Sequence, residues 1–254
     1  MENHLFNIQS LFSKKLTCIV DFFEKFTENS LFTVSIKDIK TRKICLHNKK
    51  CAEVWGLGEV GLIGMSSRDC LEQVTGFIDR ENALKHFEAE EAKAISSNST
   101  HTKTIAILDY DGFVRIRQHL TIPVCGTRNQ IVAITAICTD LTAHTNFLHL
   151  FKLYLKYYVK PRAIAQLSKY LRLDNYFRFK LTAMELSTLL AMVEDPRHKQ
   201  VAYLLTDFRQ RPITSTTISN YVDSIKGKLK INIDIYMVLS NLRGRYQWML
   251  KHII

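Results

Sequence analysis

The spacing of apolar residues changes once along this chain of 254 residues, and the change limits the folds available to it. From about residue 31 to 140, apolar residues follow the short period of β-strands in stretches bounded by turn residues. Beyond about residue 145 they recur every three or four residues, which is the period of amphipathic helices. The sequence therefore predicts a sheet-containing domain followed by an all-helical domain.

The first domain is predicted to contain strands at residues 31–36, 43–47, 102–109, 113–122 and 130–138. Between the second and third strands, residues 79–95 are rich in good helix formers. The last three strands are separated by Asp109-Tyr-Asp-Gly112 and Gly126-Thr-Arg-Asn129, which predict hairpin turns because glycine tolerates positive φ. This order predicts an α+β fold, an antiparallel sheet with helices on one face.

The second domain is predicted to contain helices at residues 145–159, 163–171, 182–193, 197–205, 215–229 and 234–250. Pro161 separates the first two, because proline cannot continue the interior of a helix. Short turns join the others, apart from the longer segment 206–214.

A further apolar stripe runs through residues 4–28, at Leu5, Ile8, Phe12, Leu16, Ile19, Phe23 and Phe26. It predicts an amphipathic helix within residues 1–30 whose apolar face needs a partner surface. That surface belongs either to the following domain or to a second copy of the chain. The second alternative predicts a homodimer.

The net charge of +11 is confined to the helical part of the chain. Residues 1–150 hold 17 Lys and Arg against 17 Asp and Glu, whereas residues 151–254 hold 18 against 7. A strongly basic domain joined to a neutral one indicates a polyanion as partner, because neutralised phosphates supply most nonspecific nucleic-acid affinity. The alternative is a basic surface that only solubilises the protein.

Several classes of protein are disfavoured by the sequence. The six cysteines form no C-x-x-C pair and have no histidine at zinc-ligand spacing, so we expect reduced thiols in a cytoplasmic protein. No apolar run approaches the roughly 20 residues that span a bilayer, so we expect no membrane partner. Paired catalytic carboxylates, a nucleophile motif and a Gly-rich phosphate loop are missing, which predicts that the protein is not an enzyme.

Residues at the joints between elements resemble a PAS domain over about residues 31–142. The matching residues are Lys37-Asp38, Asn48, Trp55-Gly56, Ile63-Gly64, Asp111-Gly112, Ile122-Pro123, Gly126 and the closing Asp140-Leu-Thr142. In this family the closing Asp-x-Thr passes the signal of the sheet to an output helix. The resemblance therefore implies a sensory domain.

PAS domains hold haem, flavin, a small metabolite or no ligand, and the fold does not decide among them. The flavin photoreceptor type needs a cysteine in an Asn-Cys-Arg context, which this sequence lacks. The helical candidate for a haem ligand is His86, which we expect at the solvated surface because Lys85 and Glu88 flank it. Cys51 and Cys70 are either redox sensors or buried structural thiols.

Residues 181–239 resemble the LuxR-type (GerE-like) helix-turn-helix almost position by position. The matching segments are Leu181-Thr182-x-x-Glu185, Lys199-Gln200-Val201-Ala202-x-x-Leu205 and Thr217-Ile218-Ser219-Asn220-Tyr221-x-x-x-Ile225-x-x-Lys228-Leu229. Thr182 and Glu185 also have the spacing of a capping box at a helix start. The resemblance implies double-stranded DNA as partner and a dimer contact through the helix after Leu229.

The third segment would be the recognition helix, with a buried face and a polar face. The spacing buries Ile218, Tyr221, Val222, Ile225 and Leu229, and turns Thr216, Ser219, Asn220, Asp223, Lys226 and Gly227 toward solvent. Short polar side chains beside lysines suit a major groove, although they also occur on ordinary solvated faces. By resemblance, bases would be read by Ser219, Asn220 and Asp223, and phosphates would be contacted by Lys199, Thr217, Lys226 and Lys228.

The sequence departs from the LuxR-type pattern in three places. Glu194-Asp195-Pro196-Arg197 replaces a usual glycine before the scaffold helix, and Met184 replaces a usual arginine. The turn at 206–214 is about six residues longer than usual in this family. It carries two arginines and is either a flexible loop or a basic wing that reaches phosphate.

Together these features predict a DNA-binding transcriptional regulator in which a PAS-type domain controls a LuxR-type output domain. Its parts are an N-terminal helix at 1–30, a sensory domain at 31–142, a helical linker at 143–175 and a DNA-binding domain at 176–254. The alternative is a protein-interaction module whose helix-turn-helix no longer binds DNA. An acidic Asp223 at a base-facing position and the long turn favour that alternative.

Overall fold

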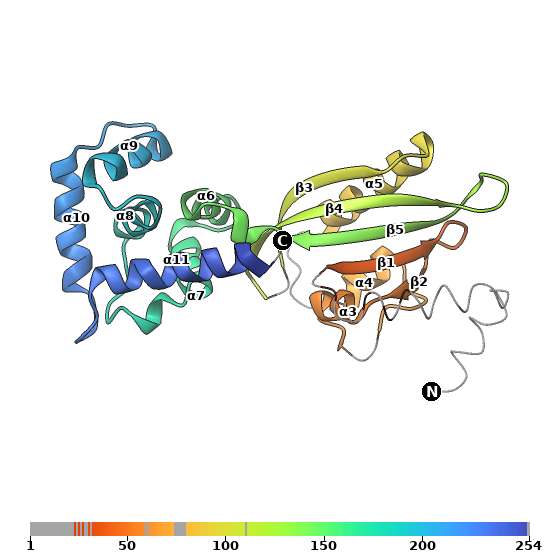
Figure 1. Ribbon diagram of the computed structural model, residues 1–254, viewed down its shortest axis with the longest axis horizontal. Coiled ribbons are helices and arrows are strands. Elements are labelled where there is room, and N and C mark those ends of the chain that lie inside the picture. Colours follow the sequence, from red (N-terminus) through yellow and green to blue (C-terminus); the bar gives the residue numbers. More distant parts are fainter. Residues whose placement is uncertain are drawn as a thin grey trace. The chain divides into compact units, whose positions relative to one another are not determined.

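The structure is a computed structural model that describes Phe23, Lys25, Thr27, Ser30 and residues 32–58, 61–73, 80–109 and 111–252, with side chains to residue 244 (Figure 1). The predicted N-terminal helix lies almost wholly outside the described residues. The chain forms two compact units. The first comprises Met1–Asp111 and Ile116–Asp140, and the second comprises Gly112–Arg115 and Leu141–Ile254.

The first unit is built on a sheet with the strand order β2-β1-β5-β4-β3. The strands are β1 (Thr33–Asp38), β2 (Ile44–His47), β3 (His101–Leu108), β4 (Val114–Cys125) and β5 (Ile131–Asp140). The central strand β5 pairs antiparallel with β1 on one side and with β4 on the other, so that Ile137 lies opposite both Val34 and Leu120. The first strand thus lies beside the last, and the predicted antiparallel arrangement is confirmed.

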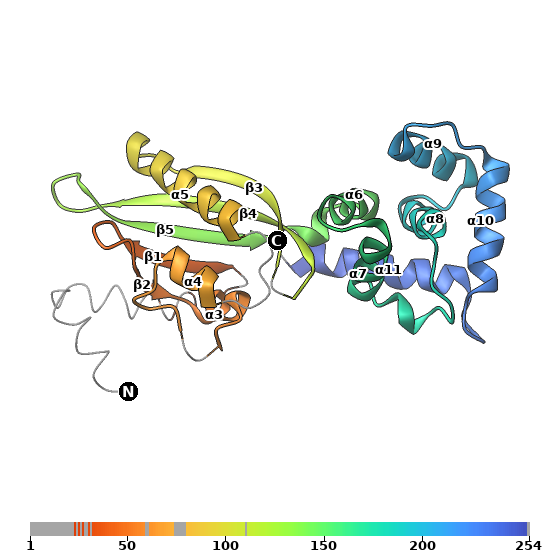
Figure 2. The same ribbon diagram turned by 180° about the vertical axis from the view of Figure 1, so that it is seen from behind.

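Helices α3 (Lys49–Trp55), α4 (Ser67–Gln73) and α5 (Arg80–Ser97) lie between β2 and β3 in the chain and cover one face of the sheet (Figures 1 and 2). Each turns apolar residues inward, among them Cys51, Cys70, Leu71 and Leu84. The α+β fold predicted from the sequence is therefore confirmed, including the helices on one face.

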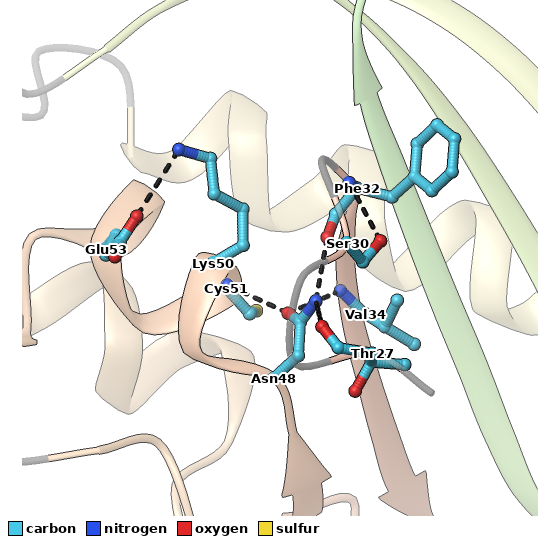
Figure 3. Close-up of polar contacts among 8 residues, drawn as sticks. All are labelled: Thr27, Ser30, Phe32, Val34, Asn48, Lys50, Cys51 and Glu53. Carbon is cyan, nitrogen blue, oxygen red and sulfur yellow. Dashed lines mark hydrogen bonds and ion pairs between the residues drawn. The ribbon is translucent and has the colours of Figure 1, made fainter. Parts of the chain in front are cut away.

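Asn48 links the start of this layer to the sheet (Figure 3). Its buried Oδ1 accepts hydrogen bonds from the backbone N–H groups of Val34 and Cys51, both at 3.0 Å. Its Nδ2 donates to the backbone carbonyls of Phe32 at 2.8 Å and Thr27 at 3.4 Å. One side chain therefore caps α3 and fixes where that helix leaves the sheet, as its short polar amide suits an N-cap.

The second unit is helical, with α6 (Phe147–Tyr157), α7 (Lys160–Tyr170), α8 (Ala183–Glu194), α9 (His198–Arg209), α10 (Ser215–Gly227) and α11 (Ile235–His252). Helix α8 occupies its centre and packs against α6, α7, α9, α10 and α11. Consistent with that position, nearly all of its residues are buried. Pro161 lies in the first turn of α7, so the predicted break before it is confirmed.

The prediction of a lengthened turn at 206–214 is wrong in the extent of that turn. Helix α9 continues to Arg209, and Gln210 closes it in the left-handed conformation with φ of 53°. The extra turn is stabilised by Phe208, whose ring stacks on the buried Phe151 of α6 at 5.9 Å between centroids. The connector before α10 is therefore short, spanning 210–214.

Candidate nucleic-acid interface and sensory cavity

Helix α10 has one buried face and one open face. Its cap Thr214 accepts a hydrogen bond from the backbone N–H of Thr217 at 3.2 Å, which fixes the helix start. Ile218, Val222 and Ile225 are buried in the packing of α10 against α8 and α9. The opposite side exposes Thr216, Asn220, Asp223, Lys226 and Gly227. Packing thus fixes the helix while its polar residues face solvent.

The two lysines predicted to flank this open face lie on different helices. Lys199 is exposed in the first turn of α9, and Lys226 is exposed near the end of α10. The Lys226 ammonium lies 3.7 Å from the carboxylate of Asp223, one turn earlier on α10. Because both side chains are solvent-exposed, this pair contributes little to stability and leaves both groups accessible to another partner.

Two other predicted residues are turned toward the protein. Ser219 is half-buried, and its Oγ lies 3.1 Å from Nδ1 of His198 at the start of α9 and donates to the Ser215 carbonyl at 3.2 Å. Thr217 is also half-buried, with its hydroxyl 2.9 Å from that of Thr214. The structure therefore places Ser219 at the contact between α9 and α10, and Thr217 at the helix start.

Lys228 is held by a buried carboxylate. Its ammonium donates to Glu185 Oε2 at 2.6 Å and to the Lys180 carbonyl at 3.2 Å. Glu185 also accepts from the Ser224 hydroxyl at 2.6 Å and from the Thr182 backbone N–H at 2.6 Å. The predicted capping box is thus present, and it extends into a network that ties α8 to the C-terminal end of α10.

The charge of Glu185 is stabilised by this network. Burial raises the pKa of the carboxyl, but the hydrogen bonds from Lys228, Ser224 and Thr182 outweigh burial and lower the pKa to about 2. Glu185 is therefore ionised throughout the physiological range. Lys228 consequently belongs to the structural network of the domain.

The first unit contains a cavity of about 90 Å³ between the sheet and its helix layer. Its apolar wall includes Ile44, Cys51, Val54, Trp55, Cys70, Phe87, Ile107 and Ala136. Its polar wall includes Lys37, Ser67, His86, Glu90, Glu91, Arg117, His119 and Thr121. The volume is enough for several water molecules or one small organic molecule.

His86 lines this cavity, so the expectation of a solvated His86 is wrong. Its Nε2 is buried and has no hydrogen-bond partner among the described residues. The ring of His86 lies edge-on to that of His119, 6.1 Å between centroids. Burial lowers the pKa of His86, and burial together with Arg117 lowers the pKa of His119 to about 4. Both imidazoles are therefore neutral near pH 7.

Three cysteines also line the cavity, and their thiols are protonated. Burial raises the pKa of Cys51 to about 12 and those of Cys70 and Cys138 to about 11. Among the described residues, no group of three or more His, Cys, Asp or Glu could hold a metal ion. No described helix is long and apolar enough to cross a membrane.

The strand order and the helix layer on one face agree with the α+β fold expected for the first unit, and helices α8, α9 and α10, of which α8 and α10 are capped, agree with the helical fold expected for the second. The chain thus joins an antiparallel sheet unit with helices on one face to a helical unit, which is the fold expected from the sequence. It matches no protein-family model and no curated protein.

Solved structures with a similar arrangement include the VqmA–ligand–DNA complex of Vibrio cholera, 16% identical, with 87% of this chain and 86% of that chain covered at a TM-score of 0.46. The phage VqmA–DPO complex is 16% identical and covers 91% of this chain and 90% of that one, at a TM-score of 0.42. A PAS domain from Colwellia psychrerythraea is 19% identical, covering 46% of this chain and 92% of that one, at a TM-score of 0.37.

Two residues of the helical unit were not predicted to have the contacts that they make. His198 bonds to Ser219 across the α9–α10 contact, and Glu185 binds Lys228 besides its cap. The capping-box spacing reveals only the local bond of Glu185. Its partner on α10 is 43 residues away, and only the packed unit brings the two groups together.

Proposed function

We propose that the chain is a DNA-binding transcriptional regulator in which the PAS-type unit senses a signal and controls the helix-turn-helix. The observation that carries this proposal is the open face of α10, which exposes Asn220, Asp223 and Lys226 while the opposite face is buried. A rigidly packed helix with short polar residues outward fits the width of the major groove.

Asn220 and Asp223 are the base-reading residues of this proposal. Asn220 is exposed in the middle of α10, where its amide is able to pair bidentately with adenine. Asp223, one turn later, is able to accept from the amino group of cytosine once Lys226 turns to phosphate. Ser219 takes a lesser part, because its hydroxyl is already bound to α9.

In this proposal, residues of both α9 and α10 contact DNA phosphates. Lys199 and Lys226 supply positive charge, and Thr217 lies in the first turn of α10, where backbone N–H groups favour an anion. Lys228 is assigned a structural role in place of a phosphate contact, since Glu185 and the Lys180 carbonyl bind its ammonium.

The protein acts as a homodimer in this proposal. Two recognition helices need a separation of about 34 Å to read an inverted repeat over one turn of the duplex. The N-terminal stripe around Phe12 and helix α11 are the two candidate dimer contacts. A small molecule bound in the PAS-type cavity would supply the signal.

The experiment is fluorescence anisotropy of the full chain on a random DNA duplex across a salt series. We expect binding whose logarithmic slope against salt is steeper than about −3, because several phosphates are neutralised. Lys199→Ala should weaken binding and flatten the slope by about one unit. Lys40→Ala is the matched control, because Lys40 is also exposed but lies in the sheet unit.

Binding absent even at low salt would overturn the proposal and favour the protein-interaction module. Equal effects of Lys199→Ala and Lys40→Ala would show that net charge alone determines affinity. That result would contradict the assignment of the interface to α9 and α10.

A further inference from the structure

Polar contacts hold helix α10 toward both of its ends, and they reach two different helices. Near the C-terminal end, Ser224 and the C-cap residue Lys228 donate hydrogen bonds to Glu185 of α8, each at 2.6 Å. In the second turn of α10, Ser219 Oγ lies 3.1 Å from Nδ1 of His198, the first residue of α9. The contact with α8 includes a buried carboxylate, whereas the contact with α9 joins two half-buried side chains.

The direction of the hydrogen bond between His198 and Ser219 follows from the atoms around it. The Ser219 hydroxyl has one hydrogen, which it donates to the Ser215 carbonyl at 3.2 Å, one turn earlier in α10. Ser219 Oγ is therefore an acceptor toward α9. The hydrogen of this bond comes from the imidazole, so Nδ1 of His198 is the donor. Nε2 is the ring nitrogen that takes no part in the contact.

The apolar face of α10 opposes a roll of the helix about its axis only weakly. Ile218, Val222 and Ile225 are buried against α8 and α9, and the hydrophobic stabilisation that they provide has no preferred direction. A hydrogen bond does have one, because it weakens as the donor and the acceptor move out of line. The bond from His198 to Ser219 therefore restrains a roll of α10 that the apolar contacts restrain less.

Ser219 lies beside the residues that we propose to read bases. Asn220 is the next residue, and Asp223 is one turn further along the same side of α10. A helix is about 10 to 12 Å across with its side chains, so a roll of about 10° moves a side-chain tip by about 1 Å. Such a shift weakens a bidentate contact with a base edge, because hydrogen-bond lengths span only about 0.5 Å.

Resting on the DNA-binding function proposed above, we infer that His198 is a positioning residue for base recognition. Its Nδ1–H group holds Ser219 and thereby fixes the roll of α10 that directs Asn220 and Asp223 to base edges. His198 itself does not contact the DNA. It therefore determines sequence choice, whereas Lys199, the next residue on α9, determines the affinity for all duplexes.

The test measures selectivity, defined as the ratio of the dissociation constant on a scrambled duplex to that on a duplex selected from a random pool. The full chain and its variants are titrated on both duplexes. His198→Ala should lower the selectivity about fivefold, which is the discrimination that one hydrogen bond provides. A merely structural role would weaken binding to both duplexes alike and leave the selectivity unchanged.

Two conservative variants show which ring nitrogen acts. Asparagine carries its amide nitrogen on Cγ, where histidine carries Nδ1, whereas glutamine carries it one atom further out, where histidine carries Nε2. His198→Asn should therefore restore most of the selectivity, and His198→Gln should not. His101→Ala is the matched control, because His101 Nε2 lies 2.9 Å from Ser97 Oγ in the sheet unit, and it should leave the selectivity unchanged.

A double variant tests whether Ser219 transmits the effect of His198. Ser219→Ala should also lower the selectivity about fivefold, since it removes the same hydrogen bond. The double variant His198→Ala, Ser219→Ala should therefore lower it no further than either single variant does. Effects that multiply would show that the two residues act separately.

The inference is overturned if His198→Ala leaves the selectivity unchanged, or if the two single effects multiply. It is also overturned if His198→Asn fails to restore the selectivity, or if His198→Gln restores it instead, since Nε2 would then contact the DNA directly. In each of these cases a selective wild type leaves the proposed function standing. A wild type that binds no duplex, or binds all duplexes alike, refutes the proposed function and the positioning role together.

Discussion

The ion pair between Glu185 and Lys228 should contribute measurably to the stability of the helical unit. The Glu185 side chain is only 4% exposed and that of Lys228 is 23% exposed, so solvent screens the pair little. Lowering the pKa of Glu185 from 4.5 to about 2 corresponds to about 3 kcal/mol of stabilisation of the ionised form. Because Ser224 and Thr182 keep their hydrogen bonds to Glu185 in Lys228→Ala, this variant should lose only part of that amount, about 2 kcal/mol of the free energy of unfolding near neutral pH.

The pH dependence follows from the direction of the shift. Because the folded-state pKa of Glu185 lies below its unfolded value, its contribution is complete above about pH 4.5 and is lost as the pH falls toward 2. The difference between the wild type and Lys228→Ala should therefore shrink over that range. Urea denaturation followed by far-ultraviolet circular dichroism, repeated from neutral to acidic pH, measures it.

Lys199→Ala is the matched control, since Lys199 is exposed on α9. It should leave the free energy of unfolding unchanged to within about 0.5 kcal/mol. Lys228 would have no structural role if Lys228→Ala also left stability unchanged and instead flattened the salt slope of duplex binding by about one unit. That result would place Lys228 on a DNA phosphate, as its position in the sequence motif first predicts.

Three further predictions concern the sheet unit and the N-terminus. His119→Gln should reduce the loss of stability at acidic pH. In the wild type, His119 takes up a proton between pH 6.5 and 4 in the unfolded state but not in the folded state, so the free energy of unfolding falls by up to about 3 kcal/mol. Denaturation at several pH values measures the difference between the two proteins. Alkylation mapped by mass spectrometry should modify the exposed Cys125 before Cys51 and Cys70, which should react only on unfolding. The two buried thiols are protonated, because the pKa of Cys51 is about 12 and that of Cys70 is about 11. Equal alkylation rates at the three cysteines would contradict the burial of Cys51 and Cys70. Phe12→Glu should dissociate the dimer in analytical ultracentrifugation, and an unchanged sedimentation profile with a lowered melting temperature would show that the stripe packs within one chain.

Local sequence predicts the elements of both units well. Apolar spacing indicates the strands and helices, and turn residues such as Gly112 and Asn48 mark where they begin and end. The extent of α9 is not predictable in this way. Its last turn depends on Phe208 stacking on Phe151, a contact between residues 57 positions apart that appears only in the packed unit.

The two sites differ in how far the sequence reveals them. The open face of α10 follows from helical spacing, so the exposure of Asn220 and Asp223 is predictable. His86 lies beside charged neighbours and therefore suggests a solvated position, yet it shares a helix face with the buried Ala83 and Glu90, three and four residues away. That spacing is a signal that could have placed His86 toward the sheet.

The most direct test of the account is the effect of Asn220→Ala on sequence choice. After selection of a preferred duplex from a random pool, titrations on that duplex and on a scrambled one are compared for the wild type and the variant. Asn220→Ala should weaken the free energy of binding to the preferred duplex by about 1 to 3 kcal/mol and should change binding to the scrambled duplex little. Asn175→Ala, the same substitution at an exposed asparagine outside α10, should change binding to neither duplex. If Asn220→Ala weakens both duplexes equally, or leaves both unchanged, α10 does not read bases in the groove.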